Sequence, residues 1–401
     1  MTVTQQEEWN FDEIIDRKGT KAIKWSPKFM EMLFGTGDLL PLWVADMDFR
    51  APQVLIDKLS QRVDHGIFGY TVAGESYSQA VIDWFQRRHN WSIEKDWMIF
   101  SPGIVPAINF LIQTFTHPGD KVIIQEPVYY PFASVIRNNG RFVLNNELLL
   151  KDDHYQIDFA DLKKQCETPR AKMLILCSPH NPVARVWTQE ELTELGKICL
   201  KNDILVVSDE IHCDLIFPGH EHIPFARINE DFQQNSIICT APSKTFNIAG
   251  LKASNIIIPN EQLRKEFAQT MANVSIRGPT IFGGLALETV YNECEAWLDS
   301  LLVYIQENFQ FLKEFVEKHL PGVKVLDLEG TYLAWVDFRG LGLNAEKLDE
   351  IMKKEAKVGL DDGAMFGESG KGFQRFNLAC PKAILKEALE RIQEAFKEYL
   401  K

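Results

Sequence analysis

Several short runs of this chain are apolar at every position, without the alternation that a half-exposed strand shows. Such runs are typical of strands that are buried on both faces of a sheet. Segments with helical spacing lie between them, the clearest beginning at Thr188, a candidate N-cap with Glu191 three positions later. Strands that alternate with helices predict a parallel or mostly parallel sheet with helices on both faces. The predicted strands are 121–124, 173–177, 204–208, 235–239 and 254–258.

The later part of the chain predicts a second, smaller body. No Gly or Pro occurs from Leu285 to Leu320, and apolar residues recur there at helical spacing, which predicts one long helix linking two bodies. A strand at 332–338 and amphipathic helices around 344–356 and 381–399 predict a small α+β domain. We therefore expect three parts. They are an N-terminal segment that packs with the small domain (1–45), a large domain (46–290), and the linking helix with the small C-terminal domain (291–401).

Charge and patterning argue against several classes of protein. The 401 residues carry a formal net charge of -13, which disfavours nucleic acid and anionic membranes as main partners. No apolar run is long enough to span a bilayer, and the first residues lack the pattern of a secretory signal. The seven Cys are scattered without a Cys-x-x-Cys pair, as expected of reduced thiols in a cytoplasmic protein. His220 and His222 have no accompanying ligand cluster, so we expect no metal site.

Polar residues follow three of the predicted strands. Asn181, Asp209 and Lys244 each lie just after a strand, and ligands of open α/β sheets bind at the carboxyl ends of strands. No Gly-x-Gly-x-x-Gly or Walker A lysine motif occurs, which excludes the two commonest nucleotide sites. An amine for an aldehyde and a carboxylate for a pyridine nitrogen are what pyridoxal phosphate (PLP) requires. The three residues therefore predict a PLP site.

Two further segments suit the other parts of that cofactor. The turn that contains Gly103 leads into an apolar helix at 107–115, and the N–H groups at a helix N-terminus bind phosphate. Tyr129 and Tyr130 follow the strand at 121–124 and offer an aromatic ring for the pyridine face.

With these motifs the chain resembles fold type I PLP enzymes of the class I/II aminotransferase superfamily. The superfamily motifs are Asn181-Pro182, Asp209 to His212, and Ser243-Lys244. Within the superfamily, segments 43–49, 178–187 and 208–214 resemble the cystathionine β-lyase and cystalysin-like C–S lyases. The likeness extends over nearly the whole chain. It implies an aspartate aminotransferase-like α/β fold, with a mostly parallel seven-stranded sheet between helices in the large domain and a small α+β domain.

The resemblance also implies roles for single residues. Lys244 resembles the lysine that forms the Schiff base and moves the Cα proton, and Asp209 resembles the partner of the pyridine nitrogen. Asn181 resembles the donor to the phenolic oxygen, where His212 could also donate. Tyr129 resembles the stacking aromatic.

The remaining roles concern the phosphate, the substrate and a second subunit. Arg375 resembles the arginine that binds the substrate α-carboxylate in a bidentate grip. Tyr70 resembles a tyrosine that reaches the phosphate of the neighbouring subunit, which implies a homodimer with active sites at the interface. Phosphate contacts are implied for Gly103, Ile104, Ser243 and Lys252, and substrate contacts for Ala45, Tyr130 and Asn181.

Three positions depart from the family pattern. Lys252 replaces a common phosphate-binding Arg, and Ala241 replaces a hydroxyl residue. Ala184 stands where Gly is usual, so its methyl group costs strain if this backbone needs a positive φ.

The implied reaction is β-elimination of L-cystathionine or related cysteine S-conjugates to thiol, pyruvate and ammonia. Lys244 is the expected base, and Tyr70 and Tyr130 are the other candidate catalytic residues. Two alternatives stay open: an aminotransferase that uses the same lysine, and a PLP-fold regulator that acts by binding a partner.

Overall fold

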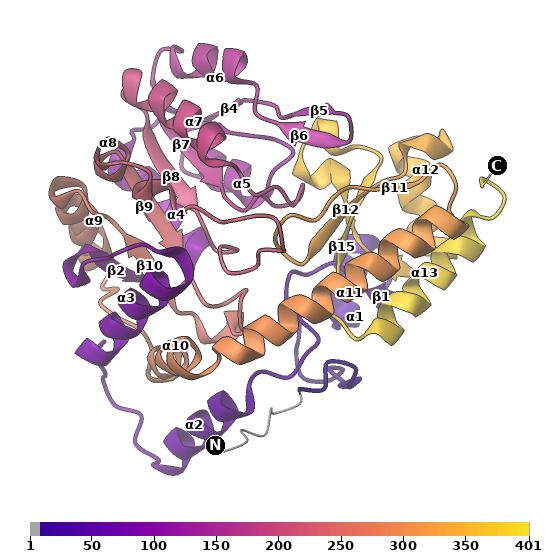
Figure 1. Cartoon of the computed structure of the whole chain (residues 1–401), viewed down its shortest axis with the longest axis horizontal. Coiled ribbons are helices and arrows are strands. Elements are labelled where there is room, and N and C mark those ends of the chain that lie inside the picture. Colours follow the sequence, from indigo (N-terminus) through magenta and orange to yellow (C-terminus); the bar gives the residue numbers. More distant parts are fainter. Residues whose placement is uncertain (1–8, 401) are drawn as a thin grey trace.

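A seven-stranded sheet forms the centre of the larger body in the computed structural model, which describes residues 9–400 (Figure 1). Across the sheet the strands are β2 Met98–Ser101, β10 Ser254–Ile257, β9 Ser236–Thr240, β8 Leu205–Asp209, β7 Ala171–Cys177, β3 Lys121–Ile124 and β4 Phe142–Asn145. Only β10 runs antiparallel to its neighbours. The mostly parallel seven-stranded sheet is therefore confirmed.

The apolar runs form strands because both faces of the sheet are covered. In β7, Leu174 and Leu176 pack into one hydrophobic core, while Met173, Ile175 and Cys177 pack into the core on the other face. Each run predicted from the sequence forms a strand of this sheet, displaced by at most a few residues. The strand is apolar at successive positions because a hydrophobic core lies on each face of the sheet.

Helices cover both faces of the sheet (Figure 1). The helices of the larger body are α2 Gln53–Asp64, α3 Glu75–His89, α4 Ile104–Phe115, α5 Pro131–Asn138, α6 Phe159–Cys166, α7 Gln189–Lys201, α8 Glu230–Gln234, α9 Glu261–Asn273 and α10 Ile281–Glu293. A hairpin, β5 Leu149–Lys151 with β6 His154–Gln156, lies outside the sheet. The predicted start of α7 is confirmed, since Thr188 Oγ1 accepts from Glu191 N at 3.2 Å and Glu191 Oε2 accepts from Thr188 N at 2.9 Å.

The prediction of one unbroken helix from Leu285 to Leu320 is wrong. Residue Cys294, with φ -116°, separates α10 from α11 Glu295–His319. The break has a tertiary cause, because α10 packs against α2 and α3 whereas α11 leaves the larger body and packs against α13 Lys382–Phe396. Arg87 and Arg88 of α3 bind Glu295 and fix the point where the direction changes.

The smaller body contains a four-stranded antiparallel sheet. Its strands, in order, are β11 Lys324–Val325, β12 Leu333–Asp337, β15 Phe373–Asn377 and β14 Asp361–Asp362, and its helices are α12 Ala345–Glu350 and α13. The helix predicted at 344–356 is α12 continued by a π-helical turn, η5 Ile351–Glu355. Short 3₁₀ turns complete the chain: η1 Lys95–Trp97, η2 Phe225–Arg227, η3 Ala249–Leu251, η4 Arg339–Leu341, η6 Gly363–Phe366 and η7 Glu368–Gly370.

The N-terminal segment reaches the smaller body. After α1 Pro27–Phe34, strand β1 Leu40–Pro41 pairs in parallel with β13 Val358–Gly359. This pairing supports our proposal that the N-terminal segment packs with the small domain. We propose that the parts meet after residues 45 and 290. The part of that proposal concerning residues 1–8 lies outside the described residues.

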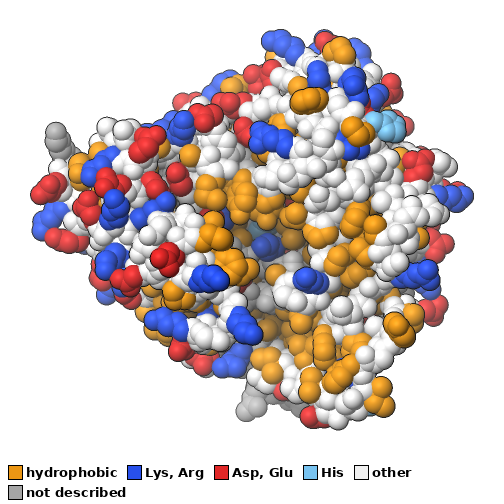
Figure 2. Space-filling view, turned by 180° about the vertical axis from the view of Figure 1, so that it is seen from behind, with side chains coloured by type: hydrophobic (Ala, Val, Ile, Leu, Met, Phe, Trp, Pro, Cys, Tyr) orange, Lys and Arg blue, Asp and Glu red, His pale blue; other side chains and the backbone are white. Residues whose placement is uncertain are grey.

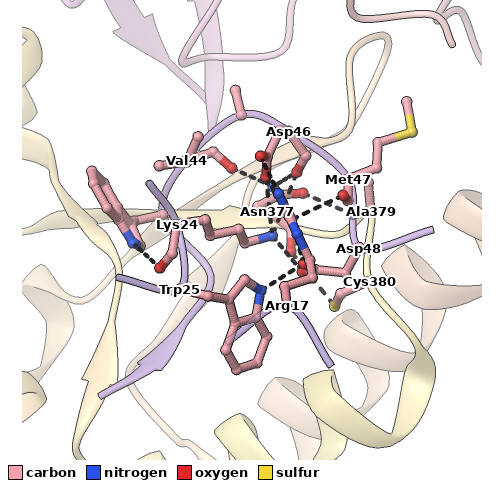
Figure 3. Close-up of polar contacts among 12 residues, drawn as sticks. Arg17, Lys24, Trp25, Val44, Asp46, Met47, Asp48, Asn377, Ala379 and Cys380 are labelled. Atoms are coloured by element: carbon pink, nitrogen blue, oxygen red, sulfur yellow. Dashed lines mark hydrogen bonds and ion pairs between the residues drawn. The ribbon is translucent and has the colours of Figure 1, made fainter. Parts of the chain in front are cut away.

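A buried cluster of charges holds the segment that follows β1 (Figure 3). The side chain of Lys24 is fully buried and its Nζ lies 2.6 Å from Asp48 Oδ2. Arg17 binds both Asp46 and Asp48 at 2.7 Å. Asn377 of β15 donates to the carbonyl oxygens of residues 44 and 46, each at 2.6 Å. We call residues 43–48 the clasped loop, because these contacts fix both of its ends.

All seven Cys are buried and form no disulfide. Among residues 9–400, no helix combines the length and the apolar character needed to cross a membrane.

Candidate active site

One cavity of about 300 Å³ lies at the carboxyl ends of β7 and β8 and is closed by residues of the smaller body. Figure 2 shows a hollow in one face of the molecule, surrounded by hydrophobic side chains, with Lys and Arg side chains in and beside it. The volume is at the lower end of the range for small-molecule sites. All of the predicted site residues except Tyr70 line the cavity: Ala45, Gly103, Ile104, Tyr129, Tyr130, Asn181, Asp209, His212, Ser243, Lys244, Lys252 and Arg375.

The sheet itself brings the three strand-end residues together. Asp209 is the last residue of β8 and lies opposite Cys177, the last residue of β7, four residues before Asn181. Lys244 follows β9, the next parallel strand. Because parallel neighbours end at the same edge, the amide, the carboxylate and the amine all line the one cavity.

Asp209 is buried and forms no ion pair with any residue from 9 to 400. Its Oδ1 accepts one hydrogen bond, from the N–H of Ile211 at 3.2 Å. Burial raises the pKa of Asp209 to about 7, although the charge of Lys244 acts in the opposite direction. A cationic N–H group in the cavity would therefore find a carboxylate that gains from pairing with it.

The amine of Lys244 is held at the clasped loop. Its Nζ donates to the carbonyl oxygen of Ala45 at 2.6 Å, and the hydroxyl of Tyr332 donates to the same oxygen at 2.9 Å. Burial, with a contribution from the charge of Arg375, lowers the pKa of Lys244 to about 8. An amine with this pKa is partly neutral near neutral pH, so it can act as a nucleophile or a base.

The N-terminus of α4 opens into the cavity. Its N-cap is Gly103, no side chain caps the helix, and Ser243 and Lys252 line the same cavity. Lys252 forms no ion pair within residues 9–400. Uncapped N–H groups and a free cation together suit an anionic group such as a phosphate.

The cavity has a suitable group for each part of PLP. The pyridine nitrogen, when protonated, is a cation for Asp209, and the phosphate suits the start of α4. The buried Nδ1 of His212 has no partner within residues 9–400 and is available to the phenolic oxygen. The aldehyde needs a neutral amine, which the lowered pKa of Lys244 favours. The residues present fit the cofactor.

Two tyrosines at the start of α5 form one wall. Tyr129 is fixed by its backbone N–H, which donates to the carbonyl oxygen of Asn181 at 3.0 Å. The ring of Tyr130 lies 5.6 Å from that of Tyr129 and is partly exposed at the cavity. Burial raises the pKa of both phenols, so both stay protonated near neutral pH.

The guanidinium of Arg375 is also buried at the cavity and hydrogen-bonded. It donates to Asn181 Oδ1 at 2.8 Å and to the carbonyl oxygen of Trp43 at 3.0 Å, and it forms an ion pair with Asp361. Asp361 also lines the cavity, and sequence reasoning gave it no role. Its place depends on strand register in the smaller body, which no sequence motif indicates.

Tyr70 is the predicted residue that does not line this cavity. It lies in an irregular segment between α2 and α3, and its side chain is fully exposed. Neighbouring apolar residues are exposed as well: Val63, Ile67, Phe68 and Val72.

At Ala184 the condition under which a methyl group costs strain is met. Its φ is 59°, in the region that favours glycine, and its methyl group is buried. The left-handed conformation costs about 1 kcal/mol for a residue with a Cβ. Burial of the methyl group offsets a similar amount.

Comparisons with known proteins give matches along nearly the whole chain. The family model described as aminotransferase class I and II matches residues 35–392. The chain is 45% identical over 386 residues to cystathionine beta-lyase PatB of Bacillus subtilis, covering 96% of this chain and 99% of that protein. It is 30% identical over 391 residues to protein MalY of Escherichia coli, covering 97% and 99%. The crystal structure of cystalysin from Treponema denticola, which contains a PLP cofactor, has a TM-score of 0.94 at 42% identity, covering 98% of this chain and 99% of that one.

Proposed function

The chain belongs to the class I and II aminotransferase family, and we propose that within it the protein is a PLP-dependent carbon–sulfur β-lyase. The observation that carries the proposal is the 45% identity over 96% of the chain to a cystathionine beta-lyase. The substrates are L-cystathionine or related cysteine S-conjugates, and the products are a thiol, pyruvate and ammonia. The cofactor is PLP, as in the cystalysin structure.

The residues around the cavity have distinct tasks in binding the cofactor. Asp209 binds the pyridine N–H, and Asn181 and His212 serve the phenolic oxygen. Tyr129 packs against the ring. Gly103, Ile104, Ser243 and Lys252 hold the phosphate.

The reaction uses the same side chains at the substrate. Arg375 binds the α-carboxylate, with Ala45, Asn181 and Tyr130 beside the substrate. Bound PLP draws electrons away from Cα of the amino acid joined to it. Lys244 Nζ, whose pKa burial lowers to about 8, takes the Cα proton. The bond between Cβ and sulfur then breaks, the thiolate leaves with the electron pair, and hydrolysis gives pyruvate and ammonia.

Turnover of a panel of cysteine S-conjugates without added keto acid tests this function. The expected result is release of pyruvate and thiol in equal amounts, with L-cystathionine among the substrates. Transfer of the amino group to an added keto acid, with no pyruvate released in its absence, would show an aminotransferase instead.

We propose further that the active unit is a homodimer. The exposed apolar side chains at 63–72 support this, because a run of this kind is typical of a surface that a partner covers. Hydrophobic side chains also gather around the hollow in Figure 2. A second copy of the chain would place its Tyr70 at the phosphate of the neighbouring site.

The cytoplasm is the proposed location. Seven buried cysteines without a disulfide support a reducing compartment.

A further inference from the structure

Asp361 and Arg375 are cross-strand partners in the wall of the cavity. Asp361 lies on β14 directly opposite Arg375 on the antiparallel strand β15. Both side chains are buried, they form an ion pair, and both line the cavity. A carboxylate of the protein therefore already binds the guanidinium assigned to the substrate carboxylate.

The contact with Asp361 occupies one N–H group on Nη2 of Arg375. Nη2 donates to the carbonyl oxygen of Trp43 and to Asp361, which uses both of its N–H groups. Nη1 donates to Asn181, and the buried Nε has no partner within residues 9–400. An arginine can bind a carboxylate in two bidentate ways, with Nη2 and Nη1 or with Nη2 and Nε. Both require Nη2, so a substrate carboxylate has to displace one of its present partners.

Asp361 is the partner that can exchange. The Trp43 carbonyl belongs to the clasped loop, whose ends are fixed by Asn377 and the charge cluster. Asp361 lies on a strand of two residues, followed by the short turn η6. Burial raises the pKa of Asp361 even beside the guanidinium, so its charge is poorly solvated there.

We propose that Asp361 is a resident carboxylate on Arg375, a positioning residue that holds the guanidinium before substrate binds and is exchanged for the substrate α-carboxylate. The exchange rests on the proposed function, since it concerns the same site. It also has a consequence for specificity. A simple carboxylate has to displace Asp361 with its own charge alone, whereas an α-amino acid also gains the bond of its amine to the cofactor. The site therefore discriminates against carboxylates without an amino group.

The test variant is Asp361→Asn, and the control is Asp362→Asn. Asparagine keeps an acceptor for Nη2 but removes the competing charge. Asp362 is the adjacent residue, does not line the cavity, and accepts from the N–H of Ala364, a bond that asparagine can also make. The control removes an equal charge from the same strand without touching Arg375.

The probe is 3-(methylthio)propionate, which carries a carboxylate and a thioether but no amine. Its affinity for the holoenzyme is measured by calorimetry, beside KM and kcat for S-methyl-L-cysteine. Asp361→Asn is expected to bind the probe roughly tenfold more tightly, the effect of a one-unit change from a neighbouring charge. KM is expected to fall in the same direction, with kcat changing less than KM, and Asp362→Asn is expected to match the wild-type protein.

A supporting role alone predicts the reverse. If Asp361 only orients Arg375, its replacement weakens binding of the probe and raises KM. Either that result or an unchanged affinity for the probe overturns the proposal. Asp361→Ala is the second variant should Asp361→Asn fold poorly, with the same expected direction. Probe binding needs no turnover, so a wild-type protein without lyase activity would refute the proposed function and leave the exchange to be judged by affinity.

Discussion

At the scale of single residues, burial and charge act against each other at Asp209. Its pKa in the folded protein is about 7, above the value of 3.8 that it has when exposed. Between about pH 4 and pH 7 the folded state therefore binds a proton more tightly than the unfolded state. The contribution of Asp209 to the free energy of unfolding falls as pH rises through this window.

Replacement of Asp209 in the cofactor-free protein tests this sign. Asp209→Asn removes the buried charge, so its melting temperature relative to the wild-type protein is expected to rise from pH 4 to pH 7. The corresponding change in the free energy of unfolding, variant relative to wild type, is roughly 1.4 kcal/mol for each unit of pKa shift. Thermal unfolding at a series of pH values measures it, and parallel curves for the two proteins would contradict it. Added PLP is expected to favour the wild-type protein, because the pyridine nitrogen then pairs with the carboxylate.

Lys244 is the residue on which turnover depends most. Lys244→Ala is expected to lower the rate of pyruvate release by roughly 10²–10⁴-fold or more, the usual contribution of a positioned base. Lys252→Ala removes a second lysine from the same cavity and is expected to weaken PLP binding while losing far less rate at saturating PLP. Near-normal turnover in Lys244→Ala would refute the mechanism.

The limit of sequence reasoning is visible at these residues. Asn181, Asp209 and Lys244 could be predicted to meet because each follows a strand of one sheet. Asp361 could not, since its place depends on a short antiparallel pairing in the smaller body. That pairing leaves no spacing or motif in the sequence.

At the scale of elements, the sequence indicates what is buried more clearly than how elements are oriented. Continuous apolar runs predicted the strands, because hydrophobic cores on both sides of the sheet leave neither face of these strands exposed. The antiparallel direction of β10 and the break at Cys294 have no local signal, since both result from packing against other elements. The clasped loop is also a tertiary feature, held by residues distant in sequence (Figure 3).

The charge cluster is expected to be essential for that loop. Asp48→Ala leaves the fully buried Lys24 without its closest anion, and removal of one member of a buried pair costs about 3–5 kcal/mol. Urea unfolding measures the loss. The control is Lys324→Ala, which breaks an exposed pair with Asp153 and is expected to cost at most about 1 kcal/mol. Equal losses in the two variants would mean that the cluster contributes no special stability.

At the scale of the whole molecule, the proposed dimer can be tested by mixing two impaired variants. Tyr70→Ser and Lys244→Ala are each expected to lose activity. In a mixed dimer, one site contains Lys244 of one chain and Tyr70 of the other, so subunit exchange is expected to restore turnover. A mixture of Tyr130→Phe with Lys244→Ala is the control, because Tyr130 and Lys244 line one cavity of a single chain. Absence of any gain from the first mixture would refute the shared site.

The burial of all seven cysteines has a practical consequence for an enzyme that releases thiols. A chromogenic disulfide reagent in the reaction mixture should react with the product and hardly at all with the native protein. The same reagent should detect seven groups once the chain is denatured. The cysteines thus provide a labelling signal for unfolding that is silent in the folded enzyme and needs no engineered tag.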